Sequence, residues 1–144
     1  MLQVYLDPCT VNSRKVLAGL ELVGMPYELK HVDYFTGEQK KPEFLGINPN
    51  GAVPAVVDGD LALSESNAIL QYTADLIGAE KHYPKDLKQR ADINRWLLWE
   101  ASTWFSELLH LSRRIRRQTA IEHRAERSRH RKGGAQLAPA GRYP

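Results

Sequence analysis

The sequence predicts an α/β protein: a mixed sheet with helices packed on it, followed by the start of an all-helical domain. Three observations lead to this fold class. Residues 2–34 read strand, helix, strand, residues 55–63 carry a hairpin signal, and residues 86–111 have the apolar spacing of one long helix. A strand–helix–strand unit followed by a hairpin implies a sheet with both parallel and antiparallel neighbours.

The strand–helix–strand unit begins at the N-terminus. Apolar and polar residues alternate over residues 2–6, as in a short strand, and Asp7-Pro8 interrupts the pattern. Apolar residues then follow helical spacing from Val16 to Val23, and Gly24 ends that segment. The second strand is predicted from Tyr27 to Tyr34.

The rest of the predicted α/β domain follows a polar loop. Pro42 is placed to start a short helix, because proline suits the first helical turn. Two apolar runs around Asp58-Gly59-Asp60 predict a hairpin. Apolar residues from Ile69 to Ile77 then mark a helix face that stops at Gly78.

These elements predict four segments. Residues 1–78 form the α/β domain, residues 79–85 a linker, and residues 86–112 the first helix of an incomplete helical domain. Residues 113–144 are rich in Arg, His, Gly, Ala and Pro. A segment so poor in large apolar side chains cannot offset its own ordering entropy, so we expect it to be disordered or a frayed helical extension.

Composition narrows the class of protein. At 144 residues and 42% hydrophobic the chain can bury a core, and no apolar run approaches the length of a membrane span. We expect a soluble, cytoplasmic protein. The single cysteine, Cys9, excludes an intrachain disulfide, and the five histidines show no ligand spacing, so no metal site is predicted.

The net charge of +3 conceals an asymmetry between two parts of the chain. Residues 1–112 carry a net charge of −5 and residues 113–144 a net charge of +8. The basic character belongs to the last segment, where one tyrosine, Tyr143, gives little support for base stacking. Binding of nucleic acid or an acidic surface by Arg113 to Lys132 is a further alternative, but without a recognised motif we do not expect nucleic acid as a partner.

The hairpin has two unusual ends. Pro54 cannot donate to a strand ladder, so it must lie at the first position of a strand or on an edge. A cis bond between Val53 and Pro54 would leave the N–H and C=O of Val53 facing outward, where they could pair with a peptide-like ligand. At the other end, Ser66 lies where a helix begins, and its hydroxyl with the free amides forms an anion site.

Three stretches carry a family resemblance across residues 1 to about 105. They are DPCTVNSRKVLAGLEL at 7–22, EQKKPEFLGINP at 38–49 and GAVPAVVDGDLALSESNAI at 51–69. In their order and spacing they resemble the glutathione transferase family, as found in bacteria. The resemblance implies a thioredoxin-like N-terminal domain that holds glutathione, followed by an all-helical domain. Beyond residue 112 the resemblance ends, so we expect that domain to be truncated or replaced through a shifted reading frame.

The resemblance also implies roles for six glutathione-binding residues. Val53, which precedes Pro54, would bond the cysteinyl backbone of glutathione, and Glu65 and Ser66 would hold its γ-glutamyl end. Gln39 and Lys40 match positions that commonly hold the glycyl carboxylate. Ala52 departs from the pattern, because relatives often carry Lys or Gln there.

The first helix is the expected place for thiol chemistry. A helix N-terminus stabilises a thiolate by only ~0.3–1 kcal/mol, so a side-chain donor should precede the helix. By the family's spacing Thr10 occupies the slot of the catalytic donor, with Asn12 assisting. Cys9, one residue away, would instead act as a thiolate on disulfides. The structural alternative is that Thr10 or Asn12 merely caps the helix.

The sequence therefore predicts a glutathione transferase of detoxification type, using glutathione as co-substrate. The activated thiolate would attack an electrophile or reduce a disulfide or peroxide, with activity impaired by truncation. A homodimer is expected from the resemblance. The alternative is a non-catalytic, thioredoxin-like glutathione-binding or dimerisation module.

Overall fold

The computed structural model describes residues 1–134. The chain divides into two units, Met1–Asn94 and the residues from Arg95 onward, and each is described by itself. The first unit contains the sheet, its covering helices and most of the helix that follows them. The predicted boundaries at residues 78 and 85 therefore lie inside the first unit.

The first unit follows the predicted order of elements. Its strands and helices are β1 (Leu2–Leu6), α1 (Val11–Val23), β2 (Tyr27–His31), the short 3-10 helix η1 (Glu38–Lys40), α2 (Pro42–Leu45), β3 (Ala55–Asp58), β4 (Leu61–Ser64), α3 (Ser66–Leu76) and α4 (Leu87–Trp99), which runs into the second unit.

The second strand is shorter than predicted. The sequence suggested Tyr27 to Tyr34, but β2 ends at His31. The chain turns immediately afterwards because the Asp33 carboxylate accepts hydrogen bonds from the N–H groups of Phe35 and Thr36, at 2.9 and 3.0 Å. An aspartate that bonds the backbone two residues on favours a turn over a strand.

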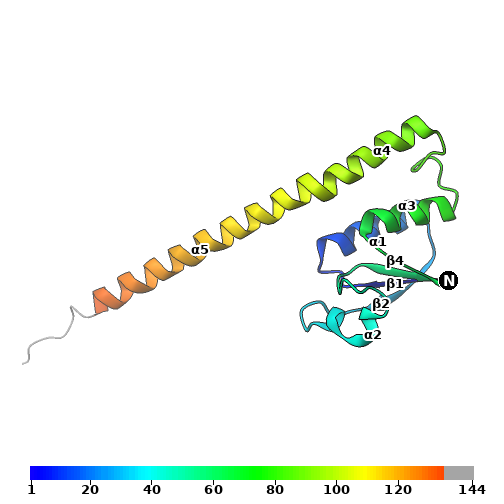
Figure 1. Ribbon diagram of the computed structural model, residues 1–144. Coiled ribbons are helices and arrows are strands. Elements are labelled where there is room, and N and C mark those ends of the chain that lie inside the picture. Colours follow the sequence, from blue (N-terminus) through cyan, green and yellow to red (C-terminus); the bar gives the residue numbers. More distant parts are fainter. Residues whose placement is uncertain (135–144) are drawn as a thin grey trace, which may run out of the picture. The chain divides into compact units, whose positions relative to one another are not determined.

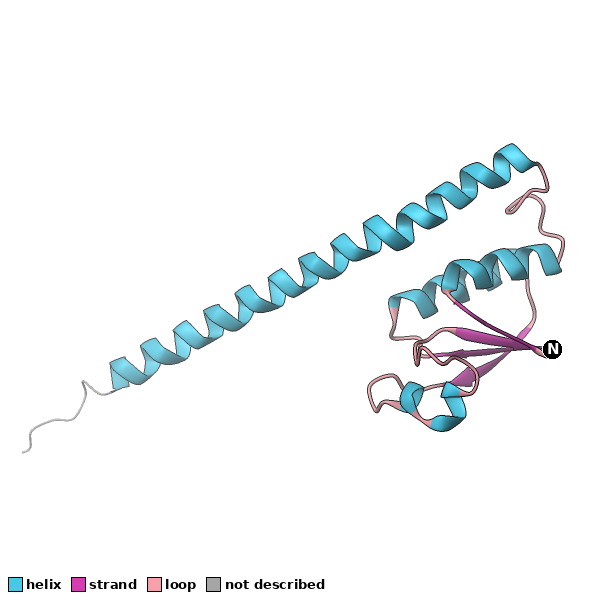
Figure 2. Ribbon diagram, viewed as in Figure 1, coloured by secondary structure: helices cyan, strands magenta, loops and turns pink. Residues whose placement is uncertain are grey.

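The four strands form one sheet in the order β2-β1-β3-β4. β1 pairs with β2 in parallel, and the β1–β3 and β3–β4 pairs are antiparallel. Figures 1 and 2 show α1 and α3 on one side of this sheet and α2 on the other. The mixed, thioredoxin-like α/β fold is thus confirmed.

Each face of the sheet has its own core. Side chains alternate across β1, and those on the face of α1 and α3 pack in a cluster of fully or almost fully buried residues: Leu2, Val4, Leu6, Val16, Leu20, Val56 and Ile69. The opposite face packs against α2 through Val32, Phe44, Val53 and Ala55. Val53 therefore belongs to the core of the face that α2 covers.

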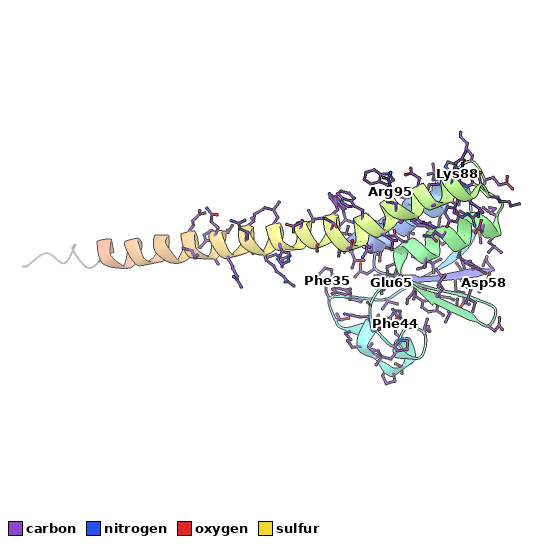
Figure 3. All side chains as sticks on the ribbon, turned by 45° about the horizontal axis from the view of Figure 1, so that its top comes forward. Phe35, Phe44, Asp58, Glu65, Lys88 and Arg95 are labelled. Carbon is purple, nitrogen blue, oxygen red and sulfur yellow. The ribbon has the colours of Figure 1, made fainter. Side chains whose placement is uncertain are left out.

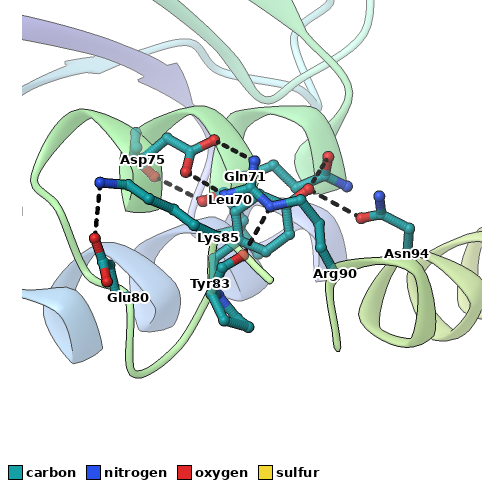
Figure 4. Close-up of polar contacts among 10 residues, drawn as sticks. Leu70, Gln71, Asp75, Glu80, Tyr83, Lys85, Arg90 and Asn94 are labelled. Atoms are coloured by element: carbon teal, nitrogen blue, oxygen red, sulfur yellow. Dashed lines mark hydrogen bonds and ion pairs between the residues drawn. The ribbon is translucent and has the colours of Figure 1, made fainter. Parts of the chain in front are cut away.

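The predicted linker is fastened to its surroundings (Figure 4). The Arg90 guanidinium donates to the Asp75 carboxylate at 2.6 and 3.2 Å and to the C=O of Pro84 at 2.8 Å. It also lies 4.1 Å from the centre of the Tyr83 ring. The Tyr83 hydroxyl lies within hydrogen-bond distance of Gln71 and Asn94. Residues 79–85 are therefore a packed connection between α3 and α4.

The second unit is helical over its described residues; for residues 113–144 the sequence left two possibilities open, a disordered segment or a frayed helical extension. A π-helical turn, η2 (Glu100–Trp104), continues α4, and α5 extends from Phe105 to Gly134. Residues 113–134 are therefore helical, while residues 135–144 lie outside the described part of the chain. Arg, Ala, Glu and Gln dominate 113–131, and these side chains form helices without needing a core.

Two structural absences hold for residues 1–134. No helix in this part of the chain is long and apolar enough to cross a membrane. No group of three or more His, Cys, Asp or Glu side chains is placed there to hold a metal ion.

Candidate functional site

The sheet brings all the predicted site segments to one edge. Leu6 is the register partner of His31 in the parallel pair, so β1 and β2 end together. Tyr5 pairs with Ala55, and Ala55 pairs with Ser64, so β3 begins and β4 ends at this same edge. The segments 7–10, 32–41, 53–54 and 65–66 all leave the sheet there.

The turn before β3 has the geometry that a peptide ligand would need. The Val53–Pro54 peptide bond is cis, and both residues are buried. Within residues 1–134 no backbone hydrogen bond uses the N–H or C=O of Val53. These two groups can therefore pair with an extended chain laid antiparallel beside them.

The start of α3 combines backbone strain with an unused hydroxyl. Glu65, labelled in Figure 3, is exposed and has φ +71° and ψ +113°, a conformation that costs a non-glycine residue about 1–3 kcal/mol. Ser66 follows it, 7% exposed, and its hydroxyl makes no hydrogen bond within the described residues. The first amides of a helix also have no intrahelical acceptor, so this corner is suited to an anionic group.

Lys15 connects the two helices that begin at this edge. Its ammonium group donates to the side-chain amide oxygen of Asn67, Oδ1, at 2.9 Å, joining α1 to the first turn of α3. The contact fixes the N-terminal ends of both helices relative to the sheet edge.

Gln39 and Lys40 pack against the turn that leads to Val53. Gln39 is 7% exposed, and its side-chain oxygen has no hydrogen-bond partner among the described residues. Lys40 is exposed and its ammonium donates to the C=O of Asn50 at 3.3 Å. Gly51, at φ +58°, lies against the Lys40 side chain: a β-carbon at position 51 would be 2.7 Å from the Lys40 Nζ. The unpaired amide is therefore held next to the Val53 turn.

Thr10 lies at the start of α1 but does not cap it with its side chain. Its backbone is extended, at φ −87° and ψ 145°, and its hydroxyl makes no capping bond. The hydroxyl lies 2.6 Å from the Ser13 hydroxyl and 3.2 Å from the C=O of Asp7. The capping interpretation of Thr10 is wrong, because its hydroxyl is directed to other partners.

Asn12 and Cys9 flank Thr10. Asn12 is half-buried in the first turn of α1, and its side chain makes no hydrogen bond within residues 1–134. It therefore does not cap the helix either. Cys9 is an exposed free cysteine whose C=O accepts a hydrogen bond from Arg14 at 3.0 Å.

Asp7 organises this corner, and the sequence did not single it out. Its buried carboxylate accepts the N–H of Cys9 at 2.8 Å and the N–H of Tyr34 at 3.0 Å. The bond from Cys9, followed by that from Tyr34, lowers the pKa of the Asp7 carboxyl below its ordinary value. The carboxylate thus joins the loop before α1 to the loop after β2.

Two further polar residues were also missed. Ser13 is completely buried beside Thr10. Asn48, almost fully buried, donates from its amide to the C=O of Ala52 at 2.7 Å and accepts the N–H of Asn50 at 3.1 Å. The Asn-Pro-Asn-Gly stretch at 48–51 is a turn signal that could have identified Asn48.

A cavity of about 530 Å³ lies elsewhere. It is on the face covered by α2 and is lined by residues that include Tyr5, Val32, Glu38, Lys41 and Phe44. None of the nine predicted site residues lines it. The geometry of the sheet edge, where unpaired polar groups converge, is the better indicator of a site.

The fold is that of a thioredoxin-like α/β domain. The family model described as glutathione S-transferase, N-terminal domain, matches residues 2–75. The chain therefore belongs to the glutathione S-transferase family.

Individual relatives agree. The chain is 41% identical over 101 residues to glutathione S-transferase theta-2 of Homo sapiens, covering 69% of this chain and 41% of the relative. It is 34% identical over 116 residues to glutathione S-transferase F10 of Arabidopsis thaliana, covering 75% and 51%. The chain thus spans about half or less of the length of these relatives.

Solved structures give the same result. Human glutathione transferase theta-2, in complex with glutathione and an unknown ligand, matches with a TM-score of 0.66 at 39% identity, over 70% of this chain and 42% of that chain. A glutathione transferase homologue from Sulfitobacter, with bound glutathione, matches with a TM-score of 0.69 at 35% identity, over 81% and 56%.

Proposed function

We propose that the chain is a glutathione transferase, which binds glutathione along the sheet edge and activates its thiol for reaction with an electrophile. The observation that carries the proposal is the convergence of unpaired polar groups at this edge: the backbone of Val53, the hydroxyl of Ser66 and the side-chain oxygen of Gln39. The Gln39 oxygen is a buried atom, and buried polar atoms in folded proteins are rarely left without a partner. The Val53 backbone groups and the Ser66 hydroxyl make no hydrogen bond within residues 1–134, so a ligand can bond them.

Each group suits one part of the tripeptide. The N–H and C=O of Val53 would pair with the cysteinyl residue of glutathione. Ser66 and the amides of the first turn of α3 would bind the γ-glutamyl carboxylate, and Glu65 its ammonium group. The Gln39 side-chain N–H and the Lys40 ammonium would donate to the glycyl carboxylate, and the Gln39 oxygen would accept from a glutathione N–H.

This arrangement directs the sulfur toward the N-terminus of α1. Lowering the pKa of a thiol from about 8.5 by about two units requires roughly 2.7 kcal/mol of preferential thiolate stabilisation. A helix N-terminus contributes ~0.3–1 kcal/mol, and a hydrogen bond to a charged acceptor ~1.5–3 kcal/mol. Thr10 Oγ1 would supply that bond with Asn12 nearby, so helix and hydroxyl together reach the required energy.

The thiolate would then act as the nucleophile. With an electrophile, a bond forms between sulfur and carbon while the leaving group departs with its electron pair. With a disulfide, sulfur attacks sulfur, the S–S bond breaks and a thiolate leaves; a second glutathione thiol then releases the other thiolate and forms glutathione disulfide. With a peroxide, sulfur attacks oxygen, the O–O bond breaks and hydroxide or alkoxide leaves; a second glutathione thiol converts the sulfenic acid to the disulfide and water. We propose that the protein acts as a homodimer in the cytoplasm and that its role is detoxification.

Calorimetric titration with glutathione tests the binding step. Removing the Ser66 hydroxyl in Ser66→Ala should weaken binding about tenfold or more, because the bond is made to a charged group. Ser106→Ala is the matched control, since Ser106 lies in α5 and its hydroxyl bonds only the C=O groups of Ser102 and Thr103 in the preceding π-helical turn, η2. Equal affinity in wild type and Ser66→Ala would refute the role of Ser66.

A second function follows from the helical unit. Among the described residues of α4 and η2 none is buried, so these helices show no core of a packed helical domain. The chain would then be a glutathione-binding or dimerisation module without turnover. Retention on immobilised glutathione, with no conjugation of an activated aryl halide, would favour this function over catalysis.

A further inference from the structure

A completely buried hydroxyl lies directly behind Thr10. Ser13, three residues further along α1, has 0% exposure, and its Oγ lies 2.6 Å from Thr10 Oγ1. A serine within a helix commonly donates to a backbone C=O three or four residues earlier. Within residues 1–134 the Ser13 hydroxyl has no such bond, and Thr10 Oγ1 is its sole partner.

Donor geometry alone makes Thr10 Oγ1 the donor to Ser13 Oγ, whereas a count of protons and acceptors favours the reverse direction. Thr10 Oγ1 is near two oxygen atoms, that of Ser13 at 2.6 Å and the C=O of Asp7 at 3.2 Å, but it carries one proton. The Asp7 C=O can only accept. If Thr10 donated to Ser13, the buried Ser13 proton would have no acceptor. If Ser13 donates to Thr10, and Thr10 to Asp7, every proton has an acceptor.

The second arrangement leaves the Thr10 proton available to a ligand. The Asp7 C=O already accepts the N–H of Thr10 at 3.0 Å, so it keeps a partner when the hydroxyl turns away. The bond from the hydroxyl, at 3.2 Å, is also the longer of the two bonds that Thr10 Oγ1 makes. An anion in front of the half-buried Thr10 can therefore take this proton without leaving Asp7 unpaired.

We infer that Ser13 is a positioning residue, which donates to Thr10 Oγ1 and thereby directs the Thr10 proton outward to the thiolate of glutathione. This role rests on the proposed function. A hydroxyl that accepts a hydrogen bond becomes a better donor, because hydrogen bonds in a chain polarise one another. Ser13 would therefore also strengthen the bond from Thr10 to sulfur, without touching glutathione.

The test is a pH titration of bound glutathione, followed by the ultraviolet absorbance of its thiolate. The comparison uses the full chain in four forms: wild type, Ser13→Ala, Ser13→Thr and the control Thr73→Val. Thr73 is also completely buried, but its hydroxyl bonds the C=O groups of Ile69 and Leu70 in α3. Its loss removes a buried hydroxyl without affecting Thr10.

Ser13→Ala should raise the pKa of the bound thiol by about half a unit to one unit, a three- to tenfold lower thiolate fraction below that pKa. The affinity for glutathione measured at low pH, where the thiol is protonated, should stay unchanged. Ser13→Thr keeps the hydroxyl and should restore the wild-type pKa, and Thr73→Val should not change it. The pKa is a midpoint, so a loss of folded protein lowers the amplitude without moving it.

Two failures can be told apart. If glutathione bound to wild type titrates like free glutathione, thiol activation itself fails, and the role of Ser13 with it. If wild type lowers the thiol pKa and Ser13→Ala lowers it equally, the role of Ser13 alone is overturned. A shift in Thr73→Val as large as that in Ser13→Ala would also overturn it, because the effect would then be general destabilisation.

Discussion

The two units of the chain form helices for different reasons. In the first unit α1 and α3 bury Val16, Leu20 and Ile69 completely against the sheet. In the second, Leu111, Ile115 and Ile121 are more than half exposed. The first pair of helices depends on tertiary packing, and α5 depends on local backbone bonds and side-chain propensity. A binding site needs the fixed positions that only packing provides.

The largest expected effect distinguishes these two kinds of helix. Leu20→Ala should destabilise the chain by about 2–5 kcal/mol, because it leaves a cavity in the core. Leu111→Ala, the same substitution at an exposed position in α5, should change stability by no more than about 0.5 kcal/mol. Urea unfolding followed by circular dichroism measures both. Comparable losses in the two variants would mean that α5 is packed as tightly as α1.

Thr10→Val should have the next largest effect, mainly on the bound thiol, although it also leaves the buried Ser13 hydroxyl without its partner. Valine keeps the shape of threonine but cannot donate, so the bound thiol should lose about 1.5–3 kcal/mol of preferential thiolate stabilisation. Its pKa should rise by about one to two units. The same spectroscopic titration measures it, with Cys9→Ser as the control for the neighbouring thiol. If Cys9→Ser gives the larger shift, Cys9 and not Thr10 acts on sulfur.

Asp7→Asn should change how the stability of the first unit depends on pH. The folded-state pKa of Asp7 is lowered, so its contribution is present above the unfolded-state pKa of about 3.9 and is lost as pH falls through the folded value. The asparagine variant should be less stable at neutral pH, and the two proteins should converge in acid. Thermal melts from pH 6 down to about pH 2 check this. A constant difference across that range would show that the charge of Asp7 is not the cause.

Arg90→Met should have the smallest effect. The methionine keeps much of the apolar stem but removes the bonds to Asp75 and Pro84. Because the Asp75 carboxylate is 47% exposed, water screens the pair, and the loss should be about 1 kcal/mol or less. The increase in hydrogen exchange from wild type to Arg90→Met should be larger in residues 79–86 than in α3. Unchanged exchange would mean that the Tyr83 contacts alone hold this connection.

Local patterns predicted the fold of the first unit well. Alternation in β1, the Asp-Gly turn between β3 and β4, and Gly24 after α1 are each short-range signals with a direct physical cause. The β2 boundary was wrong because the Asp33 side chain competes for the backbone, a bond that periodicity does not register. For residues 113–144 the sequence left both a disordered segment and a frayed helical extension open, because a low apolar content and a high helix propensity act in opposite directions there.

The site was predictable in part. Val53-Pro54 and Glu65-Ser66 stood out because proline and a helix start restrict the backbone at those positions. Ser13 and Asp7 did not, because their importance depends on contacts across a loop: Asp7 with Tyr34, and Ser13 with the hydroxyl of Thr10. A serine within a helix or an aspartate after a strand is too common to be noticed from sequence alone.

Backbone nuclear magnetic resonance during titration with glutathione tests the central claim most directly, because it reports on both units of the full chain at once. We expect the amide signals of Thr10, Val53 and Ser66 to shift together with one dissociation constant, while those of α5 stay in place. Shifts at these three residues that follow different constants, or that are absent while α5 responds, would contradict a glutathione site at the sheet edge.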